Sequence, residues 1–445
     1  MSQIAPGPRG LPLLGSALDF RRDVLGLMLE NVRRHGDIVR FHIGPFVTHL
    51  VNDPESIERV LVTNQQNYNK ATRSSAKIRS ICGESLLTSN DEAWRSQRHL
   101  MQPIFHRRSV ATFAAKMTQA IATTLERWQP HSKNGQPLDI ASEMMRLTYT
   151  IVGRALLGVD LSNDADVVER AMAEMLSHSY RRWGRMFDVP DWLPSPGNLR
   201  FQKALRSVDE IVYRIIATHR ENPAKHKDLL SMLLAARDEV TGEGLNDQQL
   251  RNQTVTFLLA GHETTANALT WTFYLLSQHP SIVRELQTEI ATVLGDRVPT
   301  LEDLPRLKLT TMVIQESMRL YPPIWAMERQ AIQDDVLGGY QIRAGSSVVI
   351  SPYVLHRDPK FWRDPERFDP TRFIEPQRVG YMPFGAGPRL CIGSEFAMLE
   401  ARLIVAMVVR EFHLELVPGH RVEPLPGITL RTRYGLPMVI RKQTS

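Results

Sequence analysis

The sequence has 445 residues, 42% hydrophobic and 23% charged, which is typical of an ordinary folded protein rather than a disordered chain. It lacks a run of about 18 to 20 apolar residues, and residues 1–15 lack the pattern of a secretory signal, so we expect a soluble, cytoplasmic protein without a membrane span. The net charge of +6 comes without a nucleic-acid-binding motif, and the two cysteines, Cys82 and Cys391, are too few for a disulfide framework.

The predicted elements begin with a proline- and glycine-rich stretch at residues 6–12, and helical periodicity then dominates from about residue 22 to 320. Prolines become frequent beyond that point, before a last helical segment at residues 394–412. Short strand-like pieces interrupt these patterns at residues 38–43, 48–51, 340–342 and 347–350. The sequence therefore predicts one mainly α-helical domain with small β-sheets, over residues 1–445.

Trp94 and Arg98 follow a helix-start signal at residues 89–91. Their spacing of four residues places both side chains on one face of the helix, so they can point at a common target. The alternative is a tryptophan packed at the edge of the core beside a solvated arginine.

The longest helical pattern runs from an N-cap at Asn246 to about residue 278. Its centre contains Gly261, Glu263 and Thr264. These residues are costly there, because a glycine loses about 1 kcal/mol against alanine in a helix and a buried carboxylate needs a partner. This local cost indicates a functional segment.

The pair His262-Glu263 has a rival interpretation as the start of a zinc-protease helix, His-Glu-x-x-His. Position 266 is alanine, so the second histidine is missing and this alternative fails. His262 is therefore expected to be a polar helix residue rather than a ligand.

A glycine-rich loop with the sequence FGAGPRLCIG, at residues 384–393, holds the second cysteine and leads into a helix. A thiolate beside a helix start and backbone N–H donors has a lowered pKa and is a good soft ligand for iron. The glycines permit close approach to a large flat cofactor, and Arg389 can meet a negatively charged propionate. Cys391 is thus a predicted metal ligand, whereas Cys82, which has no motif around it, is a predicted buried thiol.

The loop matches the signature Phe-x-x-Gly-x-Arg-x-Cys-x-Gly at Phe384, Gly387, Arg389, Cys391 and Gly393, and so resembles the cytochrome P-450 superfamily. Further motifs in the same order extend the resemblance across most of the chain. It implies the cytochrome P-450 fold, with haem b between the long central helix and the cysteine-loop helix. It also implies a monooxygenase that inserts one atom of dioxygen into its substrate by hydroxylation or epoxidation.

Residues 260–265, AGHETT, resemble the oxygen-activation motif of that superfamily. Because cleavage of dioxygen requires protons, the resemblance assigns a hydrogen-bonding hydroxyl to Thr264 and a proton relay to Glu263. Gly261 would leave room for dioxygen, and the Thr264 hydroxyl would capture the carbonyl four residues earlier. Thr265 is expected to be a packing residue.

Glu316 and Arg319 lie three residues apart, which by itself indicates no more than an exposed ion pair. In position they resemble the superfamily's Glu-x-x-Arg motif, and Arg367 would complete a buried charge network that locks the cysteine loop.

The same resemblance assigns Trp94 and Arg98 to a haem propionate. His356 would either take part in that charge neutralisation or order a loop through a hydrogen bond.

The superfamily's substrate-contact regions fall by position at residues 78–87, 181–187, 257–260, 324–327 and 428–430. Within them, the predicted pocket residues are Phe257, Ala260, Trp325, Ala326, Met327 and Leu430. Their bulk indicates a lipophilic substrate, such as a fatty acid, a terpenoid or a polyketide-like molecule, although each could equally belong to the core.

Neither a glycine-rich nucleotide-binding motif nor an iron–sulfur cysteine set is present. Electrons from NAD(P)H are therefore expected through a separate reductase and a ferredoxin or flavodoxin, and an acidic ferredoxin would suit a basic face around the cysteine loop. A monomer is expected.

Two alternative functions stay open. A peroxide-driven or coupling enzyme on the same haem would turn over better with hydrogen peroxide alone than with an electron-transfer chain. A haem-thiolate gas or redox sensor would not need the Glu263–Thr264 pair and would usually carry an output domain.

Overall fold

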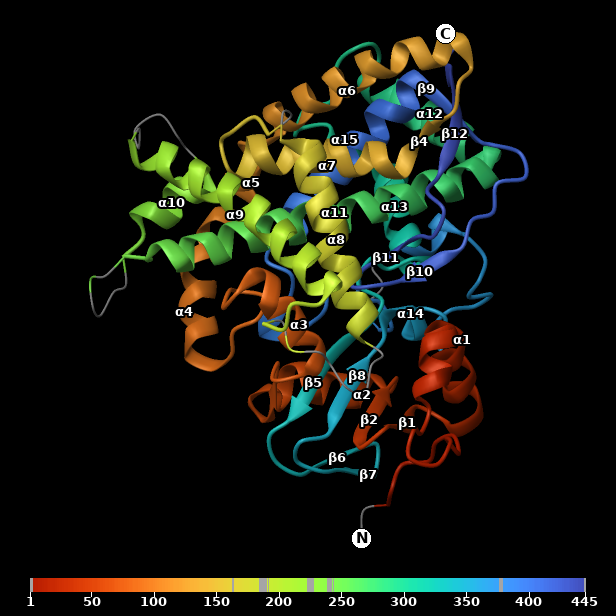
Figure 1. Ribbon diagram of the computed structural model, residues 1–445. Helices are drawn as coiled ribbons and strands as arrows, with labels where there is room; N and C mark the ends of the chain where they lie inside the picture. The colour runs from red at the N-terminus through yellow and green to blue at the C-terminus, as the bar shows by residue number, and fades with distance from the viewer. Residues whose placement is uncertain are drawn as a thin grey trace.

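The computed structural model describes residues 3–161, 164–183, 190, 192–221, 228–237, 242, 244–375 and 379–443. Its described part is mainly helical, with small sheets gathered toward one end and one side (Figure 1). The mainly α fold class predicted from the sequence is confirmed.

The longer elements follow one another along the chain. The helices are α1 (Ala17–His35), α2 (Pro54–Glu58), α3 (Arg73–Cys82), α4 (Asp91–Met101), α5 (Arg107–Ala111), α6 (Ala114–Asn134), α7 (Ile140–Leu156), α8 (Ala165–Trp183), α9 (Pro196–Glu221), α10 (Leu229–Ala235), α11 (Asp247–Gln278), α12 (Pro280–Leu294), α13 (Lys308–Leu320), α14 (Pro352–Leu355) and α15 (Ser394–Glu411). The strands are β1 (Ile38–Ile43), β2 (Phe46–Val51), β3 (Tyr68–Asn69), β4 (Leu138–Asp139), β5 (Met327–Ala331), β6 (Asp335–Leu337), β7 (Tyr340–Ile342), β8 (Ser347–Ile350), β9 (Phe412–Leu416), β10 (Pro424–Pro426), β11 (Leu430–Thr432) and β12 (Pro437–Lys442).

The largest sheet has the order β1-β2-β8-β5-β3 and joins segments from both ends of the sequence. β2 and β8 run parallel, and the other neighbours in this sheet are antiparallel. The remaining sheets are β4-β12-β9, β10-β11 and β6-β7. The strand-like pieces predicted from the sequence correspond to β1, β2, β7 and β8.

Helix α11 crosses the middle of the molecule (Figure 1). Its first residue follows a capping box, in which Asn246 and Gln249 each bond the other's backbone N–H at 2.9 Å. Its 32 residues give a length of about 48 Å. The helices that pack against α11 are α7, α9, α13 and α15, and α6 packs against α7 and α15. Helix α11 is therefore buried over most of its length.

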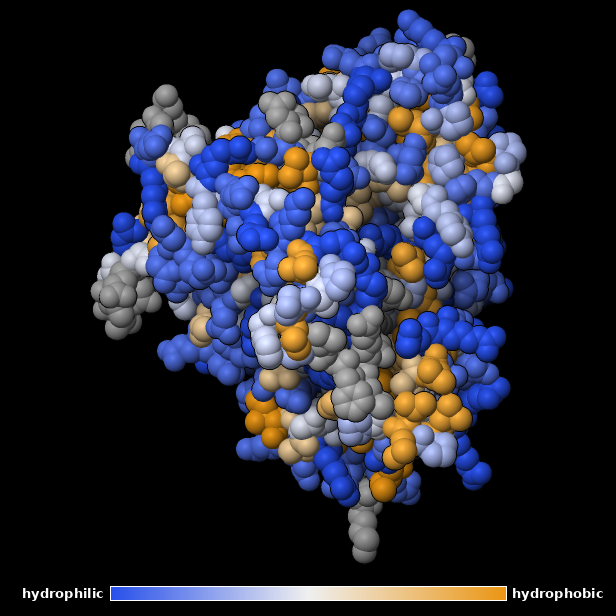
Figure 2. Space-filling view, viewed as in Figure 1, coloured by the Kyte–Doolittle hydropathy of each residue, from blue (hydrophilic) through white to orange (hydrophobic). Residues whose placement is uncertain are grey.

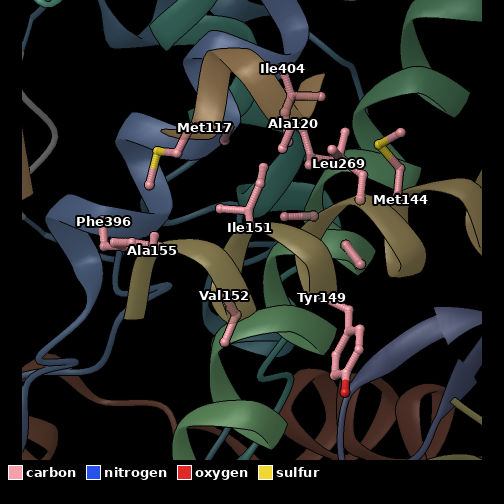
Figure 3. Close-up of a cluster of buried hydrophobic side chains, with 14 of the residues drawn as sticks. Met117, Ala120, Met144, Tyr149, Ile151, Val152, Ala155, Leu269, Phe396 and Ile404 are labelled. Atoms are coloured by element: carbon pink, nitrogen blue, oxygen red, sulfur yellow. The ribbon is translucent and has the colours of Figure 1, made fainter. Parts of the chain in front are cut away.

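The core beside α11 consists of closely packed apolar side chains from four helices (Figure 3). Figure 3 labels Met117 and Ala120 of α6, Met144, Tyr149, Ile151, Val152 and Ala155 of α7, Leu269 of α11, and Phe396 and Ile404 of α15. This packing joins the long central helix to the helix that follows the cysteine loop.

The visible surface is mainly hydrophilic, with apolar side chains gathered toward the lower right, over the N-terminal part of the chain (Figure 2). Within the described ranges, no helix is both long enough and apolar enough to span a bilayer.

A buried pair, His219 of α9 and Asp228 at the N-cap of α10, joins these two helices. The Nε2 atom of His219 lies 3.1 Å from Oδ2 of Asp228, and Nδ1 lies 2.9 Å from the Ile215 carbonyl oxygen. Both partners accept hydrogen bonds, so both ring nitrogens donate and the imidazole is protonated. Burial lowers the pKa of His219, but its hydrogen bonds, above all to Asp228, outweigh burial and raise the pKa above 6.5.

This pair predicts a specific dependence of stability on pH. The raised pKa of His219 stabilises the fold fully below pH 6.5, and that stabilisation is lost as pH rises through the raised value. Burial raises the pKa of Asp228, but its hydrogen bonds lower it overall, so its contribution is present above pH 3.8 and is lost as pH falls through the lowered value. His219→Gln should therefore cost about 3 to 5 kcal/mol near pH 6 in urea unfolding, and less at pH 9.

The matched control is His413→Gln, because His413 and Glu415 form an exposed pair. This control should change the free energy of unfolding by less than about 1 kcal/mol at any pH. An equal loss for His219→Gln at pH 6 and pH 9 would contradict the prediction.

Candidate active site

A cavity of about 900 Å³ lies against the middle of α11. Its lining includes residues of α1, α3, α4, α7, α8, α11, α13 and α15, of β1, β2, β5 and β8, and of the cysteine loop. This volume is near the upper end of the range for ligand sites, about 300 to 1,000 Å³. The cavity brings together the motif segments that the sequence spreads over more than 300 residues.

Nine residues of α11 line one side of the cavity, and three of them are not buried. Between Leu250 and Phe273, only Ala260, Gly261 and Thr264 are not buried, and all three line the cavity. The Thr264 hydroxyl donates a 2.8 Å hydrogen bond to the Ala260 carbonyl, which is the i−4 bond predicted from the sequence.

The structure gives a different reason for glycine at position 261 from the one expected. A Cβ at this position would point at α7 and come within 3.1 Å of Val152 Cγ2. The glycine therefore allows α7 and α11 to approach closely, and the expectation that it leaves room for dioxygen is not supported by the direction of the missing side chain.

Glu263 is buried but reaches the cavity lining. One carboxylate oxygen accepts a 2.6 Å hydrogen bond from the Thr429 hydroxyl, and Thr429 accepts a 3.1 Å bond from the side chain of Asn267. Asn267 lies one helical turn after Glu263, which is a signal that the sequence contained. Thr429 comes from the β10–β11 turn and had no such signal.

His262 is buried outside this lining, as expected for a residue that is not a ligand. Its Nδ1 atom bonds the Leu258 carbonyl, and its ring packs edge-on against Tyr149 at 5.7 Å. Burial lowers its pKa, so the imidazole is neutral at ordinary pH.

Cys391 faces the cavity from the loop before α15. Its backbone N–H donates to the Phe384 carbonyl at 3.0 Å, which closes the loop. Although the thiol is exposed to the cavity, the surrounding protein raises its pKa, whereas the backbone N–H of Gly393 and the charge of Arg98 lower it. A bound metal cation would favour the thiolate further.

The glycines of the loop do not share one role. Gly393 lines the cavity, as does Phe384 at the start of the loop. Gly387 does not: its φ is 69°, and a Cβ would lie 2.0 Å from the carbonyl oxygen of Leu61 in the short π-helix at Arg59–Thr63. Its assignment to the cofactor is therefore wrong, because the close approach is to another part of the backbone.

Seven cationic residues line the cavity. Three of them lie on α1, α3 and α8, namely Arg21, Lys77 and Arg181, and the other four are Lys70, Arg98, Arg329 and Arg389. Each of these last four donates to a backbone carbonyl, and none of the four forms an ion pair with a carboxylate in the described part of the chain. Burial lowers the pKa of all four, to about 10 for Arg329 and Arg389. The sequence identified Arg98 and Arg389 but missed Lys70 and Arg329, which belong to no recognisable pattern.

Trp94 supports one of these cations. It is buried, and the guanidinium carbon of Arg389 lies 4.4 Å from the centre of its ring. Trp94 and Arg98 thus both reach the cavity from α4, as their spacing predicted. A concentration of partly buried positive charge without carboxylate partners fits a ligand that carries more than one negative charge.

Glu316 and Arg319 form an ion pair that is fully buried. The two bonds between them measure 2.6 and 2.8 Å. The Arg319 guanidinium also donates to the carbonyls of His356, Pro365 and Arg367, at 2.6 to 3.0 Å.

The predicted role of Arg367 is wrong. Its side chain is exposed, and only its carbonyl takes part in the network. The second guanidinium beside Glu316 belongs to Arg372, whose Nε lies 3.3 Å from the carboxylate.

His356 orders a loop and does not bind the cofactor. Its side chain is fully buried and does not line the cavity. Nε2 accepts a 2.9 Å hydrogen bond from the Met382 N–H, so Nδ1 carries the proton and donates to the Arg319 carbonyl at 3.1 Å. Because burial lowers its pKa to about 3, it is neutral and neutralises no charge, and that part of the prediction is wrong.

The predicted substrate residues lie in the cavity, with one exception. The lining includes Phe257, Ala260, Trp325, Ala326 and Met327. Leu430 is fully buried in a separate core cluster with Phe41 and is not in the lining, whereas Ile428 and Thr429 are. Residues 184–187 of the predicted contact region lie outside the described residues.

Comparison with known proteins identifies the family. The family model described as Cytochrome P450 matches residues 5–433. The chain belongs to the cytochrome P450 family, and it is an oxidoreductase of the monooxygenase class, which uses haem and dioxygen with electrons from redox partners.

Its relatives include proteins from two Streptomyces species. Cyclooctatin synthase of Streptomyces melanosporofaciens is 36% identical over 96% of this chain and 93% of its own length. Cyclooctat-9-en-7-ol 5-monooxygenase of the same organism is 37% identical, over 93% and 90%. Pentalenene oxygenase of Streptomyces avermitilis is 34% identical, over 95% and 94%.

The residues of this chain fit the haem group of the family. A cysteine thiol faces the cavity, and four cations that lack carboxylate partners line the same space. The cavity also reaches the unburied stretch of α11, between apolar walls.

Proposed function

We propose that this chain is a haem-thiolate monooxygenase that hydroxylates or epoxidises a terpenoid. The observation that carries the proposal is one cavity that contains Cys391, Thr264, Glu263 and mainly apolar walls. Two relatives are named for a terpenoid alcohol and a terpene hydrocarbon, cyclooctat-9-en-7-ol and pentalenene, which supports this class over fatty acids and polyketides.

In this proposal, Cys391 would bind the iron of haem b, and Arg98, Arg389, Arg329 and Lys70 would bind its propionates. The bound haem would supply the activation of dioxygen. The apolar side chains of Phe257, Ala260, Trp325, Ala326 and Met327 contact the substrate and exclude water.

Thr264 and Glu263 manage protons on the α11 side. The Thr264 hydroxyl lies at the cavity surface, where it can donate a proton and then take up another proton from water. Glu263 is fixed by Thr429, so its carboxylate stays beside that surface while exchanging protons with water.

The test of the proposal is turnover with purified components. The protein would be combined with a ferredoxin or flavodoxin, a reductase and NAD(P)H, and offered a terpene, a fatty acid and a macrolide-type polyketide. Selective oxidation of the terpene is expected. Better turnover with hydrogen peroxide alone, or oxidation of the fatty acid alone, would contradict it.

We further propose that residues 1–445 act as one domain and as a monomer, which sedimentation of the holoprotein checks.

Thr264→Ala is expected to uncouple the reaction. Without the hydroxyl, protons reach dioxygen less selectively, so product per NAD(P)H consumed should fall roughly tenfold or more while hydrogen peroxide release rises. Product and peroxide would be quantified against NAD(P)H in the same assay.

Thr270→Ala is the matched control, because the Thr270 hydroxyl makes the same i−4 bond on α11, to Ala266 at 2.7 Å, but lies outside the cavity lining. Its coupling should equal that of the unmodified protein. Unchanged coupling in Thr264→Ala would remove the assigned role.

A further inference from the structure

Glu328 is a second carboxylate in the cavity, and the proton-handling role of Glu263 leaves it unexplained. Only these two acidic side chains occur among the described lining residues. Glu328 lies on β5 directly opposite Val349 of β8, which also lines the cavity. The neighbours Val348 and Ile350 are fully buried on the other face of the sheet. Because side chains alternate along a strand, Glu328 points to the cavity face.

The carboxylate is held from the opposite side of the cavity. The hydroxyl of Ser74, on α3, donates a hydrogen bond to Glu328 Oε2. One turn later on the same helix, Ile78 also lines the cavity. This contact fixes the carboxylate between α3 and β5, two of the segments that flank the predicted substrate regions.

Glu328 has unused acceptor capacity. An ionised carboxylate offers about four acceptor positions, and in the described part of the chain Ser74 is its only side-chain partner. Arg329 follows it on β5 and also lines the cavity, but its guanidinium bonds the Glu328 carbonyl rather than the carboxylate. Among the described residues, Glu328 therefore has no ion-pair partner.

A carboxylate that lies beside apolar lining residues such as Ile78 and Val349 favours ligands that donate a hydrogen bond to it. A pure hydrocarbon would displace water from the carboxylate without replacing its hydrogen bonds. A substrate hydroxyl would instead form a charge-assisted hydrogen bond with the carboxylate. Sites that bond a substrate hydroxyl discriminate strongly against the analogue that lacks it.

We propose that Glu328, positioned by Ser74, accepts a hydrogen bond from a hydroxyl group of the substrate, so that the enzyme acts on a terpenoid that already carries an alcohol. This inference rests on the proposed function. It assigns the reaction to a late oxidation: an earlier enzyme, a hydrating terpene cyclase or another oxygenase, must supply the alcohol. The relative named cyclooctat-9-en-7-ol 5-monooxygenase bears the name of such an alcohol.

The experiment is an absorbance titration of the purified holoprotein, in which a bound ligand changes the haem spectrum. The probes are matched pairs that differ only in the hydroxyl, cedrol with cedrane among them, together with cyclooctat-9-en-7-ol and its deoxy hydrocarbon. The alcohols should bind roughly 10- to 100-fold more tightly than the hydrocarbons. Glu328→Leu should bring this ratio to about one, without weakening hydrocarbon binding, and Glu328→Gln should lower it by a smaller factor.

Two further variants separate recognition from a structural tie. Ser74→Ala keeps the Glu328 carboxylate but removes the hydrogen bond that positions it. This variant should lower the ratio of alcohol to hydrocarbon affinity less than Glu328→Leu does. Glu285→Gln removes a charge from the exposed surface of α12, outside the cavity lining, and should leave the ratio unchanged. If Glu328 only joins α3 to β5, its variants will weaken alcohols and hydrocarbons equally.

The possible failures are distinguishable. Equal affinity for alcohol and hydrocarbon in the unmodified protein, or a ratio that survives Glu328→Leu, overturns this inference and leaves the terpenoid assignment intact. A complete lack of terpenoid binding by a protein with a normal haem-thiolate spectrum overturns the proposed substrate class, and the inference with it. The spectrum of each reduced, carbon-monoxide-bound variant shows that it is folded and loaded.

Discussion

Cys391→Ser is expected to abolish the strongly red-shifted Soret band of the reduced, carbon-monoxide-bound holoprotein. The thiolate donates electron density to iron in a way that a serine hydroxyl cannot, and Cys391 is the only cysteine among the described residues that line the cavity. Oxygenase activity should fall below detection. The measurement is the difference spectrum after dithionite reduction, with haem content determined separately.

Cys82→Ala is the matched control for this experiment. Cys82 is fully buried on α3, and burial raises the pKa of its thiol to about 11, so it is an unreactive thiol outside the cavity lining. Its removal should leave the red-shifted band in place. A band that persists in Cys391→Ser, or disappears in Cys82→Ala, would show that the ligand has been misassigned.

Loss of either member of the Glu316–Arg319 pair should have the largest effect on the fold. Both side chains are fully buried, and removal of one leaves an uncompensated charge, at a cost of about 3 to 5 kcal/mol. We expect Arg319→Met and Glu316→Gln to yield little holoprotein. Urea unfolding and the ratio of haem to protein measure the two consequences separately.

Arg367→Ala tests the structure against the motif. Since the network uses only the Arg367 carbonyl, this substitution should change the free energy of unfolding by less than about 1 kcal/mol. Arg372→Ala should cost more, because its guanidinium lies beside Glu316. A loss of several kcal/mol in the free energy of unfolding of Arg367→Ala would contradict the assignment made from the structure.

The sequence predicted features that depend on local physics. The bounds of α11 follow from the capping residue Asn246 and from Pro280, and the structure confirms the start at Asp247. The cavity-facing position of Thr264 and Cys391 was likewise recognisable, because unusual residues occur where a helix or loop would otherwise avoid them.

Features that depend on long-range geometry were not predictable. Lys70 lies in the short segment between β3 and α3, and Arg329 lies on β5. Only the folded chain brings these two cations into the lining of the same cavity. Arg367 was misassigned because a sequence does not show whether a side chain or a carbonyl makes the contact. For His356 the sequence left two roles open, and only the folded chain shows that its imidazole orders a loop. Leu430 was misassigned because its neighbours in the chain, and not its own side chain, face the cavity.

The bonds of Arg319 also determine when during synthesis the site can form. Its three carbonyl partners lie 37, 46 and 48 residues further along the chain, so they leave the ribosome after it. The first of them, His356, also carries the imidazole that bonds Met382 at the start of the cysteine loop. The buried guanidinium of Arg319 therefore stays without its full set of carbonyl partners until residue 367 has been made. The thiol proposed as the haem ligand is made later still, after α11, Lys70, Arg98 and Arg329.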